Sequence, residues 1–175
     1  MTDFILREVK RICTKYRTRD PFELLDCIWA VTRFTNCYER DGLKGYCTVI
    51  HRIKYAVINA NLPQEWQRIV AAHEGAHLIL HMDDIMHSPI KTLRDINLVD
   101  STGQIEFQAN LFAVDFLLED DIVLESLHDE DMDFFSMARK LYIPPQLLAF
   151  KVYSMNHRGY AVEMPINLDS QFLGK

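Results

Sequence analysis

The sequence predicts an α+β fold that is mostly helical, with one small β-sheet. Long stretches carry apolar residues at helical spacing, whereas the segment from Gly42 to Asn61 is rich in Val, Ile and Tyr, which favour strands. No internal repeat, low-complexity tract or linker divides the chain. Because a chain of 175 residues can bury a core of its own, we expect a single domain over residues 1–175.

Residues 1–40 are predicted to form two helices. In the first, Ile5, Val9 and Ile12 recur at helical spacing. The second lies in the stretch RDPFELLDCIWAVTRF and starts with Asp20 as its N-cap and Pro21 at its first helical position. We expect this second helix to continue to the end of that stretch.

Residues 42–82 are predicted to hold the sheet and the central helix. The stretch GYCTVIHRIKYAVINANL is typical of a hairpin or of two strands. The stretch LPQEWQRIVAAHEGAHLILH then returns to helical spacing, with Pro63 near its start. The helix therefore follows the strands directly along the chain.

Three further segments complete the predicted fold. Residues 83–101 are polar and have no clear period, so we expect a long loop of the kind that often has a function. Residues 102–119 are predicted to form an amphipathic helix, with Ser101 and Gln104 in capping-box spacing at its start. Residues 131–156 are predicted to form two short helices that separate at Ile143-Pro144-Pro145.

The composition argues against several classes of protein. A net charge of −6 is unusual for a protein whose main partner is nucleic acid, because phosphate binding depends on clustered Lys and Arg. No apolar run approaches the roughly 20 residues of a membrane span, and charged residues near the N-terminus break any signal-peptide pattern. The four cysteines form no C-x-x-C pair, and we expect them to be reduced and mostly buried. We therefore expect a cytoplasmic protein.

Two histidines interrupt the apolar stripe of the central helix. In VAAHEGAHLILH, His73 and His77 are four residues apart, and Glu74 directly follows the first. At about 100° per residue, both histidines fall inside the stripe that contains Trp66 and Val70. Side chains at i and i+4 are about 6 Å apart, so the two imidazoles can bind one ion. A core histidine bonded to a backbone carbonyl is the ordinary alternative, but an H-E-x-x-H pattern on a helix favours a metal site.

This spacing suits hydrolytic chemistry on zinc. Neutral imidazoles bind Zn²⁺ well, and a catalytic zinc has three protein ligands and one open position for water. Glu74 lies at the edge of the stripe and can act as general base on a water molecule whose pKa the metal lowers to near 7. We expect one Zn²⁺ per chain, with Mn²⁺ as the alternative ion. Gly75, on the opposite side of the helix, indicates that another element approaches closely there.

Glu106 is the best candidate for the third ligand. It lies next to the predicted core stripe of its helix, and a buried carboxylate needs a partner. The small residues Ala109 and Ala113 would let this helix approach the central one. The alternative is a glutamate at the rim, favoured in the first turn by the helix dipole. We expect His81 to be structural, because it lies a further turn along the helix from His77.

These motifs resemble the ImmA/IrrE family of zinc metallopeptidases. The family pattern is an A-H-E-x-x-H-x-x-x-H helix followed by an E-x-x-A-N-x-F-A helix, and RIVAAHEGAHLILH and EFQANLFAVDFLL are similar to its two parts. DPFELLD, YAVINANLP and the C-terminal helix pair occur in similar order, so the resemblance covers most of the chain. One departure is that the usual H-E-[LI]-[GA]-H is His-Glu-Gly-Ala-His here, which leaves the ligands unchanged.

The resemblance implies a compact gluzincin-like fold with a small sheet over the metal helix. Carried over by position, it implies His73, His77 and Glu106 as metal ligands and Glu74 as the catalytic base, with Asn110 in the helix of the third ligand. It points to the shorter ImmA-like members of phages and mobile elements, which cleave helix-turn-helix repressors to relieve repression. The expected partner is therefore a protein substrate, with no membrane binding and no direct nucleic-acid binding.

The sequence leaves the supporting groups open. We expect an extended substrate segment to pair with an edge strand from residues 46–59, and the loop over residues 82–101 is a hypothetical site of restraint on activity. A second group should orient each ligand histidine, and Asp115, Asp100 or a backbone carbonyl could serve. The candidates for an oxyanion donor are Tyr46, Tyr55, Tyr142, Tyr153, His128 and His157.

Two other functions compete with an endopeptidase. The C-terminal helices have the spacing of a helix-turn-helix, which would suit a metal-sensing DNA-binding regulator. However, the would-be recognition helix offers only Lys151 for phosphate contacts. A non-proteolytic anti-repressor that grips a repressor would keep the same motifs, but it does not need the base Glu74. The sequence therefore favours a zinc-dependent endopeptidase.

Overall fold

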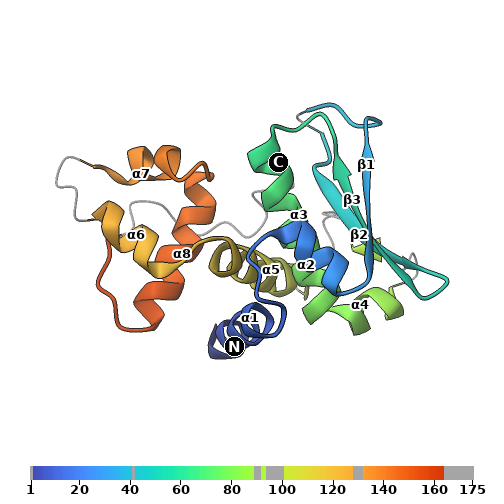
Figure 1. Cartoon of the computed structure of the whole chain (residues 1–175), viewed down its shortest axis with the longest axis horizontal. Coiled ribbons are helices and arrows are strands. Elements are labelled where there is room, and N and C mark those ends of the chain that lie inside the picture. The colour runs from blue at the N-terminus through green and yellow to red at the C-terminus, as the bar shows by residue number, and fades with distance from the viewer. Residues whose placement is uncertain (1, 41, 89–91, 94–100, 128–131, 164–175) are drawn as a thin grey trace.

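A four-stranded sheet covers one side of the central helix α3, and α5 with the C-terminal helices lies on its other side (Figure 1). The computed structural model describes residues 2–40, 42–88, 92–93, 101–127 and 132–163. The fold is α+β and mostly helical, as predicted. The helices are α1 (Thr2–Tyr16), α2 (Pro21–Cys27), α3 (Gln64–Leu80), α4 (Met82–His87), α5 (Ser101–Leu117), α6 (Asp120–Leu127), α7 (Phe134–Lys140) and α8 (Pro145–His157).

The sheet confirms the predicted hairpin. Its strand order is β1-β3-β2-β4, with β1 parallel to β3 and the other pairs antiparallel. The turn between β2 and β3 contains His51 and Arg52, whose φ angles of 50° and 66° are the left-handed values that suit a two-residue hairpin turn. The strands are β1 (Ala30–Thr35), β2 (Gly45–Ile50), β3 (Ile53–Asn59) and β4 (Thr92–Leu93).

The second predicted helix is shorter than expected, and a strand follows it. Asp20 caps α2 as predicted, because its side chain accepts two backbone N–H groups of the first turn. However, α2 ends at Cys27, Trp29 adopts a φ of 59°, and β1 begins at Ala30. The prediction of helices throughout residues 1–40 is therefore wrong. The physical reason is a distant partner, since β1 pairs with β3 along its whole length.

Helix α3 is central because it contacts both layers of the fold. It packs against β2 and β3 on one side and against α5 on the other, and α2 lies beside it. The element behind Gly75 is α2, as a Cβ at this position would lie 3.6 Å from Leu25. This is ordinary van der Waals contact, so space does not require glycine there.

The region predicted as a loop over residues 83–101 contains regular structure. Helix α4 starts at Met82 and buries Ile85, and β4 pairs with β2 at Cys47 and Thr48. Residues 89–91 and 94–100 of this region lie outside the described part of the chain. The structure also contains α6, a helix that the sequence did not predict. These elements are too short for a helical or strand period to stand out from loop sequence.

The predicted C-terminal helix pair is confirmed as α7 and α8, and a buried network of charges joins α8 to α5. Lys151 of α8 is 2% exposed, and its Nζ lies 2.8 Å from both Asp115 and Asp120. It also donates to the carbonyl of Leu118 at 2.7 Å, while Ser154 donates to Asp115 at 2.6 Å. Lys151 is therefore not available for the phosphate contact that a recognition helix would need.

No described helix combines the length and the apolar character that crossing a membrane requires.

The four cysteines are free, as expected. The expectation that most of them are buried is wrong, because only Cys47 is buried and Cys37 is exposed. The single domain over residues 1–175 stays a prediction.

Replacing Lys151 with Met tests the buried network. Methionine keeps most of the volume but removes the charge, so that the buried Asp115 loses the cation at 2.8 Å and keeps only Arg158 at 3.8 Å. Breaking a buried ion pair in this way costs about 3–5 kcal/mol. We expect the free energy of unfolding, measured by urea denaturation, to fall by that amount. Lys140→Met, on the exposed side of α7, should change it by less than about 0.5 kcal/mol, and equal stabilities of the two variants would contradict the role of the network.

Candidate metal centre

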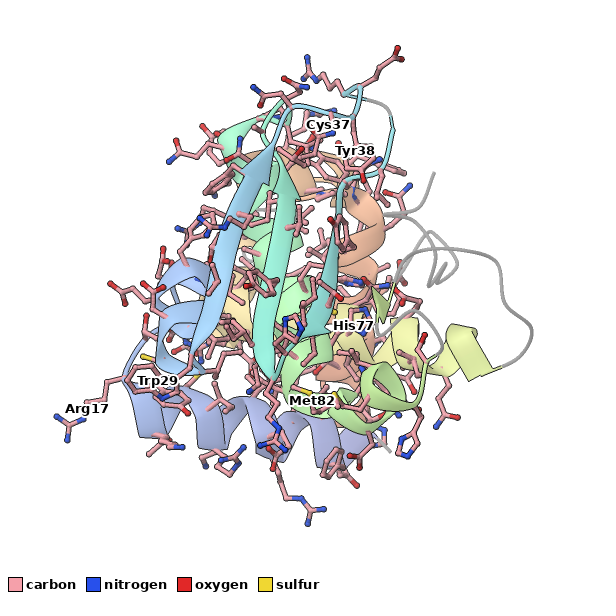
Figure 2. The ribbon with its side chains drawn as sticks, turned by 90° about the vertical axis from the view of Figure 1, so that its right-hand side faces the viewer. Arg17, Trp29, Cys37, Tyr38, His77 and Met82 are labelled. Atoms are coloured by element: carbon pink, nitrogen blue, oxygen red, sulfur yellow. The ribbon has the colours of Figure 1, made fainter. Side chains whose placement is uncertain are left out.

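Three side chains from two helices converge in the core: His73 and His77 of α3, and Glu106 of α5. Nε2 of His73 lies 3.1 Å from Oε2 of Glu106, and Nε2 of His77 lies 3.2 Å from Oε1. The two Nε2 atoms are 3.0 Å apart. Figure 2 shows His77 on the β2 side of the sheet, opposite β1. The three residues predicted as ligands are therefore neighbours in the fold, and together they form what we call the ligand cluster.

Helix periodicity and small side chains bring the ligand cluster together. His73 and His77 are one helical turn apart, and their ring centroids are separated by 4.6 Å. On α5, Ala109 and Ala113 are buried, and their methyl groups leave room for α5 to approach α3, as expected. Glu106 is 8% exposed. The alternative of a glutamate at the rim is therefore wrong.

Burial decides the protonation of the ligand cluster. Loss of hydration lowers the pKa of His77 to about 4, against the opposing attraction of Glu106. Burial also opposes ionisation of Glu106, but the attraction of His77 and His73 and their hydrogen bonds outweigh it and hold the pKa of Glu106 below its ordinary value. Near neutral pH, His77 is thus a neutral imidazole and Glu106 a carboxylate, and these are the forms that bind a metal.

The ligand cluster fits a tetrahedral zinc ion. Zinc binds imidazole nitrogen and carboxylate oxygen at about 2.0–2.2 Å, which places neighbouring ligand atoms about 3.3 Å apart. The separations of 3.0, 3.1 and 3.2 Å are close to this value. Two imidazole nitrogens also face each other beside a carboxylate, so the lone pairs of all three groups can bind one cation. Across the described residues, no other group of three His, Cys, Asp or Glu side chains meets so closely.

Glu74 lies on α3 between the two histidines and faces the sheet. It is 6% exposed. A Cβ at Gly45, the first residue of β2, would lie 3.4 Å from Oε1 of Glu74. The same Cβ would also lie 2.4 Å from Cγ1 of Val70 and 2.9 Å from the carbonyl oxygen of Val57. Only glycine therefore lets β2 approach the central helix at Glu74.

His81 is buried beside the ligand cluster without belonging to it. Helix α3 ends at Leu80, and the imidazole of His81 packs so that its Nδ1 lies 3.0 Å from Nδ1 of His77. Its Nε2 lies 2.9 Å from Oε1 of Gln108 on α5. Burial lowers the pKa of His81, so the ring is neutral near pH 7. The sequence did not predict the contact with Gln108. The only signal of the contact between His81 and His77 was their four-residue spacing.

Of the two carboxylates considered from the sequence as orienting groups, the one that the structure describes is engaged away from the ligand cluster. Asp115 accepts hydrogen bonds from Lys151 and Ser154 in the network between α5 and α8. Asp100 lies outside the described residues. Behind His77, the structure places the side chain of His81.

The five candidate oxyanion donors that the structure describes lie outside α3 and α5, the two helices that carry the ligand cluster. Because side chains alternate along a strand, Tyr46 lies on the opposite face of β2 from Gly45. Tyr55, which pairs with Thr48, shares that face. The remaining candidates are placed as follows: Tyr142 is 73% exposed, His157 pairs with Asp3, the hydroxyl of Tyr153 lies 3.5 Å from that of Thr2, and His128 lies outside the described residues.

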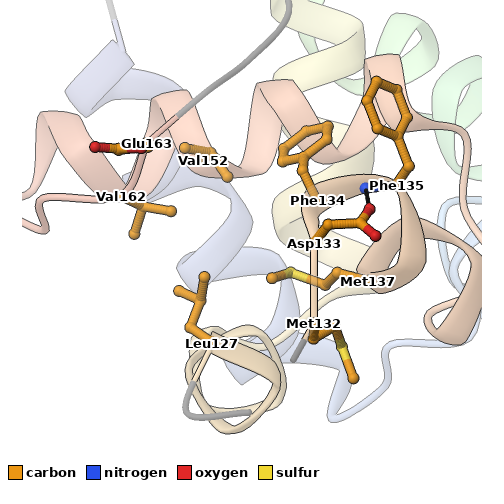
Figure 3. Close-up of a pocket in the computed structure, with 9 residues that line it drawn as sticks. All are labelled: Leu127, Met132, Asp133, Phe134, Phe135, Met137, Val152, Val162 and Glu163. Carbon is orange, nitrogen blue, oxygen red and sulfur yellow. Dashed lines mark hydrogen bonds between the residues drawn. The ribbon is translucent and has the colours of Figure 1, made fainter. Parts of the chain in front are cut away.

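An apolar pocket of about 660 Å³ lies among the C-terminal helices (Figure 3). Its lining includes Leu127, Met137 and Val152, and none of its lining residues belongs to α3 or α5. Its acidic members are Asp133 and Glu163, and Asp133 is engaged in capping α7. The pocket therefore offers no convergent groups for chemistry, unlike the ligand cluster.

Gly45→Ala tests the close approach of β2 to α3. The added methyl group would overlap Val70 and the backbone of β3, so we expect the free energy of unfolding to fall by about 1–3 kcal/mol. Gly103→Ala is the matched control, because a Cβ at Gly103 on α5 meets nothing within 4 Å and alanine favours a helix by up to about 1 kcal/mol. Urea denaturation of both variants measures the difference. A Gly45→Ala protein as stable as wild type would show that the contact is not a constraint.

Comparison with known proteins agrees with this geometry. The Peptidase_M78 family, described as the IrrE N-terminal-like domain, matches residues 38–153. A protein of Bacillus phage phi105, named "Uncharacterized immunity region protein 2", is 34% identical over 122 residues, which cover 70% of this chain and 73% of the phage protein. The family match contains both α3 and α5. The resemblance inferred from the sequence is thus confirmed, and the chain belongs to the Peptidase_M78 family of IrrE/ImmA-like metallopeptidases.

Proposed function

We propose that the protein is a zinc-dependent endopeptidase that cleaves a helix-turn-helix repressor of a phage or mobile element. The observation that carries this proposal is the buried cluster of His73, His77 and Glu106, with Glu74 next to it on the same helix. Three protein ligands and an adjacent carboxylate are the groups that metal-dependent hydrolysis needs. Membership of a metallopeptidase family supports the same reaction.

Each residue has a separate role in this proposal. His73, His77 and Glu106 hold the metal. When bound, zinc supplies a Lewis acid that polarises the peptide carbonyl and lowers the pKa of a water molecule to near 7. Glu74 takes a proton from the water as the water oxygen attacks the carbonyl carbon, and it passes this proton to the amine nitrogen as the peptide bond breaks. One water molecule is consumed for each bond cleaved.

The donor set favours zinc over manganese. Two imidazoles and one carboxylate suit Zn²⁺, whereas Mn²⁺ prefers carboxylate, carbonyl and water oxygens in an octahedral arrangement. Mn²⁺ is therefore the alternative ion rather than the expected one.

The substrate is proposed to bind along β2. Of the two strands in residues 46–59, β3 lies between β1 and β2, so only β2 can offer an edge. Strand β4 covers this edge at Cys47 and Thr48. Gly45 lies beyond that pairing and next to Glu74. A peptide that adds to the sheet at this end of β2 would present its backbone carbonyl near the base.

The phage relative supports a repressor as substrate. Its name places it in the immunity region of Bacillus phage phi105. A repressor made from the same region would meet the enzyme in the cytoplasm. This substrate and this location are part of the proposal.

Direct DNA binding is not favoured by the C-terminal helices. The helix that would enter the major groove is α8, and its residues Leu147, Leu148, Phe150, Lys151, Val152 and Met155 are all buried. The exposed residues of α8 are Gln146, Asn156 and His157 near its two ends, and none of them is the lysine or arginine that phosphate contacts usually need. We therefore propose no DNA-binding role.

Metal analysis of purified variants tests the ligands. Wild-type protein should hold one zinc per chain, measured by mass spectrometry. His77→Ala and Glu106→Ala should lose the zinc, because two protein ligands bind too weakly, whereas Glu74→Gln should keep it. His87→Ala is the matched control, since His87 is exposed on α4. Zinc retained by Glu106→Ala would show that the third ligand is a different residue.

Glu74→Gln tests the base. Glutamine keeps the shape of the side chain but cannot accept a proton, so cleavage should slow by about 10²–10⁴-fold while zinc stays bound. The measurement is fragment formation from a co-purified repressor of the same element, with a metal chelator as a second control. If Glu74→Gln relieves repression as well as wild type and no fragments form, the protein acts as a non-proteolytic anti-repressor.

A further inference from the structure

His81 connects the ligand cluster to α5 through both of its ring nitrogens. Its Nδ1 lies 3.0 Å from Nδ1 of His77, and its Nε2 lies 2.9 Å from Oε1 of Gln108. The residue is 3% exposed, so these contacts are formed in the protein interior. Each of them needs one donor and one acceptor, and this requirement decides where the protons lie.

Only one arrangement of protons is compatible with His77 as a metal ligand. Nε2 of His77 faces Glu106 and must offer a lone pair on that side, so the proton lies on Nδ1. This Nδ1–H donates to Nδ1 of His81, which must accept. His81 then carries its proton on Nε2 and donates it to Oε1 of Gln108, an oxygen that can only accept.

We propose that His81 and Gln108 are positioning residues that hold His77 in the tautomer and the orientation that bind the metal. This inference rests on the metal centre of the proposed function. Both nitrogens of His81 are engaged in this relay, so its ring has no lone pair to offer an ion. The relay ends on α5, the helix that also carries Glu106, and it thereby ties a ligand of α3 to the helix of the third ligand.

The first test compares the zinc affinities of His81 variants. His81→Leu removes the acceptor for His77 and should weaken zinc binding by about 10–100-fold, the usual effect of losing such a partner. His81→Asn places a carbonyl oxygen where Nδ1 accepts and should restore most of the affinity. His87→Leu, at an exposed histidine of α4, should bind zinc like wild type. Competition with a chromophoric chelator measures the affinity, and thermal melts establish that each variant is folded.

The second test addresses the other end of the relay and the protons themselves. Gln108→Met removes the acceptor for His81 with little change in volume and should weaken zinc binding, whereas Gln108→Glu keeps an acceptor oxygen and should not. In the zinc-loaded wild type, ¹⁵N NMR spectra should show His77 as the Nδ1–H tautomer and His81 as the Nε2–H tautomer. A histidine that only fills space would show neither the rescue by asparagine nor this pair of tautomers.

The outcomes separate the relay from the metal centre. Equal zinc affinity of wild type and His81→Leu, or an Nδ1–H tautomer of His81, would overturn the relay and leave the metal centre in place. Equally weak binding by His81→Asn and His81→Leu would overturn the role of His81 as an acceptor. A wild-type protein that binds no zinc would overturn the proposed metal centre and the relay together.

Discussion

Two imidazoles and a carboxylate are buried between α3 and α5, and the rest of the fold is arranged around them. A polar group removed from water without a partner costs about 1–3 kcal/mol in proteins, and here His73, His77 and Glu106 are partners of one another. These contacts form only at one distance and one register of α3 and α5, because a shift of either helix would separate the histidine nitrogens from the glutamate oxygens. The small residue Ala109 lets α5 approach α3, and Gly45 lets β2 approach the sheet side of α3.

Contacts at the far end of α5 hold the register that the ligand cluster needs. Arg19 donates to the carbonyl oxygens of Asp115 and Phe116, at 2.9 Å each, where the negative end of the helix dipole favours a cation. Lys151 binds the carboxylate of Asp115 from α8. Because a helix is stiff, fixing its last turn limits rotation about its axis, and Glu106 is thereby kept facing α3. A charge network distant from the site thus contributes to its geometry.

Helix α3 presents two different faces to the two layers. His73 and His77 face α5, and Glu74, rotated by about 100°, faces β2 at Gly45. Glu74 is only about 60° from His77 around the helix axis, so the proposed base borders the face that carries the two histidines of the ligand cluster. In the proposed function, this places the base between the ligand cluster and the end of β2.

The sequence by itself determined the features that depend on local period. Two histidines four residues apart on an apolar stripe specified the central helix and its buried polar face, and the position of Glu106 beside a core stripe predicted that it is buried. Only the tertiary structure decided that residues 30–35 form the strand β1, because this conformation depends on pairing with β3, more than twenty positions further along the chain. It also decided the contacts of His81, whose Nε2 meets Gln108, 27 residues later. Periodicity reports what neighbours along the chain prefer, whereas strand pairing and the direction of a buried ring depend on partners that only the folded chain supplies.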